Sequence, residues 1–171
     1  MSQNIWKKDD RILDLVAKHY NVEQRAANTY FHLATLAKSI GYDYAAKFFY
    51  KMGIDKQEAH MTRLINYLMK FDYVLKSDSI IVSESVDFND IASIFKFAVD
   101  TESKVRNSVY KVVDAAFAGK DFETFEAMQW FVRDSIEDLE EINDLATYAS
   151  ANNANMLDVE NMILNKLKDK E

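Results

Sequence analysis

Apolar residues recur at three- and four-residue spacing over four long stretches of this chain, and no proline interrupts any of them. Glycine, the other common helix breaker, occurs only at Gly41, Gly53 and Gly119. The spacing predicts helices over approximately residues 9–40, 43–70, 89–118 and 121–150, followed by a short fifth helix over 156–168. Such a chain can bury its apolar stripes only by packing helix against helix, so the sequence predicts an all-α fold.

The connections between these stretches predict how the helices are arranged. Helices of about 27 to 30 residues are roughly 40 to 45 Å long, a length typical of an elongated bundle. The first and third connections are short, so each joins an antiparallel pair of helices. The second connection, residues 71–88, is long and polar, with a possible extended piece at Ile80, Ile81 and Val82. We therefore expect one domain over 1–171, a four-helix bundle with one long crossover and a short C-terminal helix.

Charge and composition narrow the class of protein. The formal net charge of −7 opposes binding to nucleic acid and to anionic membranes, and it suits cationic ligands. The chain has no cysteine, which excludes disulfides and thiolate metal sites. Its first residues lack the apolar run of a secretory signal, and its most apolar stretch is too short to span a bilayer. We expect a soluble, cytoplasmic protein.

Each of the four long helices carries a side chain able to bind a metal within its own apolar stripe. These side chains are Glu23, His60, Glu102 and Asp138. A buried carboxylate costs several kcal/mol unless it is paired, hydrogen-bonded or bound to a metal. One such residue is most often a satisfied polar group in a core, but four helices with the same feature predict that the groups meet at one site. Oxygen ligands with one imidazole favour iron, manganese or zinc.

Two further positions limit the chemistry of that site. Gln57 precedes His60 by three residues, so both side chains are expected to point to the core. A di-iron centre in a bundle uses a glutamate at that place to bridge two cations, and an amide supplies neither the charge nor the second oxygen. Such a centre also has a second glutamate–histidine pair, three residues apart, on another helix. In the fourth helix Ser135 and Asp138 occupy the two positions of that pair.

These residues and their neighbours resemble those of the ferritin family, and most closely those of its bacterial non-haem members. The resemblance rests on segments in all four helices: Asn21-Val22-Glu23 followed by Tyr30, then His60-Met61-Thr62-Arg63-Leu64, then Thr101-Glu102, then Gln129-Trp130-Phe131-Val132. It covers nearly the whole chain, including the crossover and the fifth helix. It implies a ferritin-like four-helix bundle and a homo-oligomer, a hollow cage of twenty-four subunits that oxidises and stores iron, with no haem.

The resemblance also implies roles for single residues. Glu23, His60 and Glu102 match metal ligands of the ferroxidase centre, and Tyr30 matches the tyrosine beside it. Gln57 and Ser135 then stand at two degraded ligand positions. An outer iron site common in bacterial members would use Lys56, Asp134, Glu137 and Asp138, where Lys56 replaces a carboxylate and would repel a cation. By the same analogy Glu123 and Glu126 are candidates for the lining of an iron channel, although acids in the first turn of a helix also complement its dipole.

The sequence therefore predicts an iron-binding and iron-storing cage subunit with a degraded ferroxidase centre, in which di-iron oxidation is slow or absent. Zinc or manganese could bind in place of iron, and the cage could also contain a second, catalytically intact subunit. An active ferroxidase with an atypical ligand set is one alternative. A DNA-protecting cage is another, which the acidic charge and the crossover without its own helix disfavour. His19, one turn before Glu23, is a residue at the edge of the core, a hydrogen-bonding partner of a metal ligand, or an additional ligand.

Overall fold

The computed structural model describes residues 8–76, 78, 86–151 and 153–168, and the secondary structure within these ranges is entirely helical. The helices are α1 (Asp10–Ser39), α2 (Asp43–Asp55), the π-helical turn η1 (Lys56–Met61), α3 (Thr62–Met69), α4 (Ile91–Ala118), α5 (Phe122–Ala149) and α6 (Met156–Lys168). This confirms the all-α fold expected from the spacing of apolar residues. The extended piece expected at Ile80, Ile81 and Val82 lies outside the described residues. Among the described helices, none is both long and apolar enough to cross a membrane.

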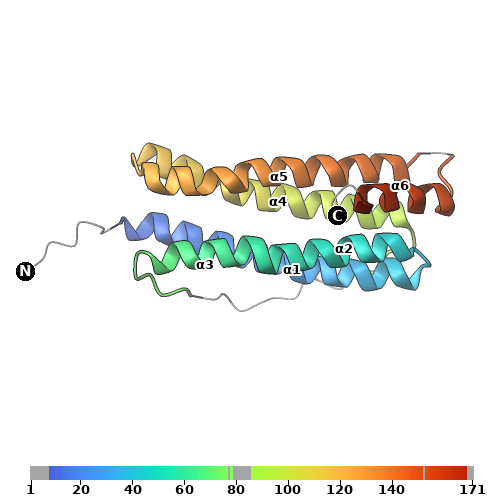
Figure 1. Cartoon of the computed structure of the whole chain (residues 1–171), viewed down its shortest axis with the longest axis horizontal. Helices are drawn as coiled ribbons and strands as arrows, with labels where there is room; N and C mark the ends of the chain where they lie inside the picture. The colour runs from blue at the N-terminus through green and yellow to red at the C-terminus, as the bar shows by residue number, and fades with distance from the viewer. Residues whose placement is uncertain (1–7, 77, 79–85, 152, 169–171) are drawn as a thin grey trace, which may run out of the picture.

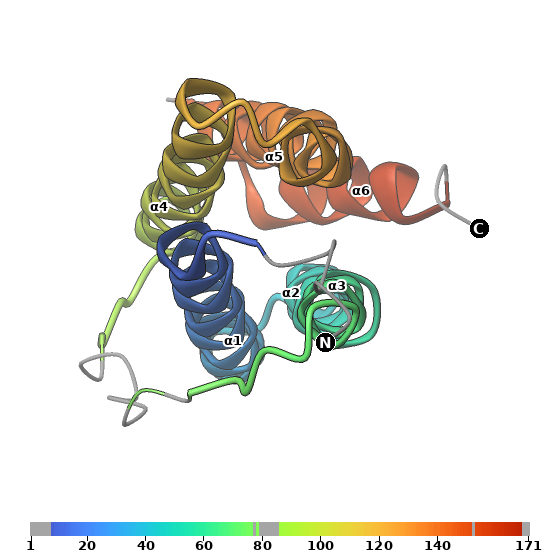
Figure 2. The ribbon, with the colours of Figure 1, turned by 90° about the vertical axis from the view of Figure 1, so that its left-hand side faces the viewer.

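The long helices form the expected bundle (Figure 1). α2, η1 and α3 follow one another without a break and make a single long helix that runs beside α1. α4 and α5 form the second hairpin, and the view down the bundle shows the four long helices at its four corners (Figure 2). Helix α6 lies against α2 and α5 at the end of the bundle far from the start of α1.

The apolar core is divided into two clusters along the bundle. One cluster lies towards α6 and takes residues between Ala26 and Ala37 of α1, together with Phe49 and Phe95. The other lies towards the start of α1 and takes residues between Leu13 and Tyr20. Glu23 falls between these two sets on α1 and is completely buried. A layer of polar side chains thus interrupts the core near the middle of the bundle.

Three aspartates fix the beginnings of the long helices. The side chains of Asp9, Asp90 and Asp121 accept hydrogen bonds from backbone N–H groups in the first turns of α1, α4 and α5. These bonds satisfy backbone donors that have no partner within the helix. Gly41 adopts a φ of +92° in the turn between α1 and α2, a backbone conformation that residues other than glycine rarely adopt.

Glu160 attaches α6 to the bundle. Its carboxylate accepts hydrogen bonds from the backbone N–H groups of Tyr44 and Ala45 in the first turn of α2, at 2.9 to 3.1 Å. We expect Glu160→Ala to lower the free energy of unfolding by about 1–2 kcal/mol, the usual loss when a helix N-terminus loses its cap. Chemical denaturation checks this, with Asn161→Ala on the exposed face of α6 as the control. Equal stability of the two variants would contradict the capping role.

Candidate metal centre

The π-helical turn η1 decides which side chains of the second long helix enter the bundle. Lys56 and His60 are buried there, with exposed fractions of 0% and 1%, whereas Gln57 is exposed. A π turn holds more residues than an α turn, so residues four apart, and not three apart, share the inner face. The expectation that Gln57 points to the core with His60 is therefore wrong, and the residue in that place is Lys56.

The ammonium group of Lys56 lies among three carboxylates from three other helices. Its Nζ is 3.1 and 3.2 Å from the two carboxylate oxygens of Glu102 and 3.0 Å from Oδ2 of Asp138. Oε2 of Glu23 is 3.8 Å away. By the family resemblance, Lys56 was expected at an outer site, where it would repel a cation. The structure corrects this, because the side chain turns inwards and itself supplies a cation at the centre of the bundle.

His60 joins this cluster through Glu23. Its Nδ1 is 3.0 Å from Oε1 of Glu23, and Nε2 of His19 approaches the same oxygen at 3.2 Å. His19 is completely buried, and its Nδ1 lies 3.2 Å from the hydroxyl of Ser108. His19 therefore belongs to the polar layer and not to the edge of the core. One carboxylate oxygen of Glu23 thus faces two imidazole rings, while its other oxygen faces the ammonium group of Lys56.

The tyrosine expected near the site also lies in this layer. The hydroxyl of Tyr30 donates a hydrogen bond of 2.5 Å to Oε1 of Glu102. Burial and the negative charge of Glu102 raise the pKa of Tyr30 well above its usual value, so the phenol keeps its proton. Burial raises the pKa of Glu102 to about 7, although Lys56 acts in the opposite direction. Of the cluster's carboxyl groups, Glu102 therefore takes a proton near neutral pH.

The charges of Lys56 and Glu23 stabilise each other. Burial lowers the pKa of Lys56, but the carboxylates of Glu102, Glu23 and Asp138 outweigh that effect and raise it well above its usual value. The pKa of Glu23 lies well below its usual value because Lys56 and His60 oppose the effect of burial. Lys56 is therefore an ammonium and Glu23 a carboxylate at neutral pH, so the cluster meets most of its charge requirement without a metal.

The centre of the bundle does not fit a pair of metal ions in this arrangement. The ammonium hydrogens of Lys56 point at oxygens of Glu102 and Asp138, which would have to face the metals instead. A divalent cation between Glu23 and Glu102 would also lie close to a buried positive charge, and buried charges are poorly screened. The carboxylates expected as ligands are present, but a lysine side chain occupies the space between them.

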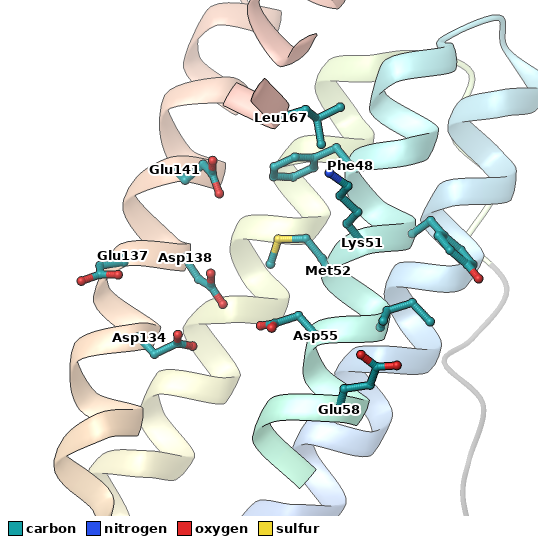
Figure 3. Close-up of a pocket in the computed structure, with 12 residues that line it drawn as sticks. Phe48, Lys51, Met52, Asp55, Glu58, Asp134, Glu137, Asp138, Glu141 and Leu167 are labelled. Atoms are coloured by element: carbon teal, nitrogen blue, oxygen red, sulfur yellow. The ribbon is translucent and has the colours of Figure 1, made fainter. Parts of the chain in front are cut away.

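Asp138 and Ser135 lie on α5, at the edge of the same layer. Ser135 is buried, and its hydroxyl donates to the backbone oxygen of Val132 at 3.1 Å, within its own helix. Asp138 lies between the ammonium group of Lys56 and a pocket of about 710 Å³ on the opposite side. Asp134 and Asp138 point across this pocket towards Asp55 on α2 (Figure 3). Glu137 is exposed at its rim.

The two channel candidates lie at the start of α5, before Ser135 and Asp138 on the same helix. Glu123 forms an ion pair of 2.5 Å with Lys8, whose ammonium group also contacts Asp121. Glu126 is exposed one turn later. A channel role for either residue stays a prediction.

The place of Lys56 at the centre of the bundle was not expected from the sequence. Lys56 follows Met52 by four positions and precedes His60 by four, so the helical spacing that identified the other residues also included Lys56. A lysine in an apolar stripe is usually assigned to its edge, because its long side chain can reach water. Three carboxylates on three other helices keep this one inside.

The charge on His60 predicts how stability depends on pH. Burial lowers the pKa of His60, but the charge of Glu23 and the nearby carboxylates of Asp134 and Asp55 raise it to about 11 from a usual 6.5. Since the pKa is raised on folding, its contribution to stability is complete below pH 6.5 and is lost as the pH rises towards 11. With a chelator present, we expect the free energy of unfolding to fall from about pH 6.5 to 9.5, below the range of lysine titration. Denaturation curves should show this slope, and His60→Gln should remove it; an equal slope in both proteins would contradict the assignment.

Comparison with known proteins places this geometry in a family. The sequence model of the ferritin-like domain matches residues 13–150. The crystal structure of M. penetrans ferritin superposes with a TM-score of 0.91 at 55% identity, covering 95% of this chain and 99% of that one. The uncharacterized protein UU427 of Ureaplasma parvum serovar 3 is 29% identical over 164 residues, 94% of each chain. A bacterial non-heme ferritin of Campylobacter jejuni is 24% identical over 127 residues, 74% of this chain and 75% of its own.

The family match covers all four long helices of the bundle except the first three residues of α1, and it includes every residue of the polar layer. The M. penetrans ferritin extends the likeness over nearly the whole of both chains. The chain belongs to the ferritin family.

Proposed function

We propose that this protein is an iron-storing cage subunit in which a lysine closes the centre of the bundle to a pair of iron ions. The observation that carries this proposal is the position of the Lys56 ammonium group, 3.0 to 3.2 Å from carboxylate oxygens of Glu102 and Asp138. The proposal keeps the degraded ferroxidase centre expected from the sequence. Slow oxidation then results from the positive charge of Lys56 inside the site, and not from the absence of a bridging carboxylate at Gln57.

Charge supports slow oxidation at the bundle centre. Two iron ions a few ångströms apart need shared carboxylates to offset their mutual repulsion. Here the carboxylates of Glu23, Glu102 and Asp138 already offset the buried ammonium group. To enter, the first iron would have to displace Lys56 into the pocket or remove its proton. Both steps cost free energy, so pairing of two irons at this position is rare and their joint oxidation by oxygen is slow.

Storage then depends on the other properties of the chain. A net charge of −7 attracts Fe(II), and carboxylates on the inner surface of a cage would bind and nucleate the mineral. The relatives named as ferritins support iron as the cargo. A cage of twenty-four copies is the assembly that the family resemblance implies. We place this cage in the cytoplasm, either as a homomer or together with a catalytically intact subunit.

Oxidation kinetics test the proposal directly. We expect Fe(II) added in air to be oxidised by the purified cage far more slowly than by a bacterial ferritin whose ligand set is intact. Gln57→Glu should leave this rate unchanged, since that side chain is exposed. Absorbance of the ferric product gives the rate, and analytical ultracentrifugation gives the subunit number. A rate equal to that of the intact ferritin would overturn the proposal.

A further inference from the structure

A second group of ligand atoms lies on the pocket side of His60, away from the bundle centre. His60, Asp134 and Asp138 can each offer one ligand atom such that these atoms lie within 4.8 Å of one another. Nε2 of His60 is 3.0 Å from Oδ2 of Asp134 and 3.3 Å from Oδ2 of Asp55. Three helical segments, η1, α5 and α2, thus bring one imidazole nitrogen and three carboxylates to one place.

Two of these atoms are buried and have no hydrogen-bond partner among the residues that the structure describes. They are Nε2 of His60 and Oδ2 of Asp134, which face each other without hydrogen-bond geometry. His60 itself is 99% buried, since its exposed fraction is 1%. A buried polar atom without a partner is costly, and a bound ion is one of its common explanations. The ring of His60 cannot turn freely, because Glu23 holds its other nitrogen and Trp130 packs against the ring edge-on, with 5.0 Å between centroids.

We propose that His60, Asp134 and Asp138, with Asp55 opposite them, bind a single divalent transition-metal ion at the inner end of this pocket. One neutral nitrogen with carboxylate oxygens is the ligand set of Fe(II), Zn(II), Mn(II) and Co(II). Bonds of about 2.0 to 2.2 Å to a tetrahedral ion separate its ligand atoms by roughly 3.3 to 3.6 Å. The contacts of 3.0 and 3.3 Å at Nε2 need only a small opening to reach that spacing. The ion takes the position of the Nε2 proton, which leaves to solvent.

The position of Lys56 separates this site from the bundle centre. Its ammonium group binds Oδ2 of Asp138 from the inner side, which leaves the other oxygen of that carboxylate for the pocket. The outer iron site implied by the family resemblance shares Asp134 and Asp138 with this site, but it also uses Glu137 and the residue at position 56. Here Glu137 is exposed at the rim and Lys56 faces inwards, so neither completes the proposed site. The ligand that replaces them is His60.

Titration with Co(II) tests the site without any oxidation step. This metal gives visible absorption bands whose strength reports tetrahedral coordination, so weakly bound ions on acidic surfaces contribute little. We expect one strongly absorbing Co(II) per subunit in the metal-free cage, displaced by Zn(II). Asp134→Asn removes a partly exposed ligand and should weaken this binding by about 100-fold. Losing a residue that only supports a metal ligand already weakens binding by about 10- to 100-fold. Glu58→Gln removes the same charge from an exposed position on the same pocket and should leave binding unchanged.

Glu137→Gln distinguishes this site from the outer site implied by the family. Retained tetrahedral absorption in that variant supports the ligand set with His60, and its loss overturns the proposal. Crystals soaked in Co(II) should show an anomalous peak within bonding distance of Nε2 of His60 and a carboxylate oxygen of Asp134. A peak between Glu23 and Glu102, or no peak at all, would overturn it as well. The inference rests on the proposed function only for iron as the metal that the protein stores. Co(II) binding at His60 and the Fe(II) oxidation rate are measured separately, so either result can fail without the other.

Discussion

Lys56→Met is expected to lower the free energy of unfolding by about 3–5 kcal/mol, the usual cost of removing one partner from a buried ion pair. Methionine fills a similar volume and its flexible side chain can adopt many rotamers, so the loss of stability arises from the missing charge and not from a cavity. Without the ammonium group, the carboxylates of Glu23, Glu102 and Asp138 lose the cation they face. For a chain of this size the thermal midpoint should fall by about 10 °C.

The pH dependence of this loss identifies its cause. The pKa of Glu102 is already raised to about 7, so in the variant this carboxyl group is the first to take a proton as the pH falls. Protonation removes part of the repulsion, and the destabilisation should therefore be smaller at pH 5 than at pH 8. Calorimetry or denaturant titration at both pH values measures it. The matched control is Gln57→Met at the exposed neighbouring position, where a change within about 0.5 kcal/mol is expected. Equal losses at positions 56 and 57 would show that the buried charge is not the cause.

Lys56→Glu is expected to convert the bundle centre into a site that needs a metal. The new carboxylate would stand among Glu23, Glu102 and Asp138, so the metal-free protein should be destabilised at least as much as Lys56→Met. Divalent ions should restore stability, because an ion that binds only the folded state stabilises it in proportion to the logarithm of its concentration. The oxidation of Fe(II) in air should become faster than in the unchanged protein by about tenfold or more, since a bridging carboxylate lets two irons bind together.

The same substitution one residue later is the control for this gain. Gln57→Glu introduces an identical side chain into the same turn but on the exposed face. It should change neither the thermal midpoint in the presence of Zn(II) nor the oxidation rate. A gain of rate in Gln57→Glu with none in Lys56→Glu would show that the π turn rearranges when metal binds, and that position 57 is the bridging place after all.

Much of the architecture follows from local properties of the sequence. Apolar spacing without proline specifies long helices, and the lengths of their connections specify two hairpins joined by one crossover. The same spacing identified Glu23, His60 and Glu102 as buried, because a residue within an apolar stripe faces the core together with its apolar neighbours. Tyr30, two turns after Glu23, follows the same rule and meets Glu102.

The sequence by itself therefore determined the helices, their pairing and the layer at which their polar residues meet. Only the tertiary structure decided which residue of the second long helix occupies the centre of that layer. The ideal α-helical period assigned this position to Gln57, and the wider turn at Lys56–Met61 gives it to Lys56. A buried ammonium group is stable only because three other helices each bring a carboxylate to it. These contacts join residues up to 82 positions apart, so no local pattern contains them.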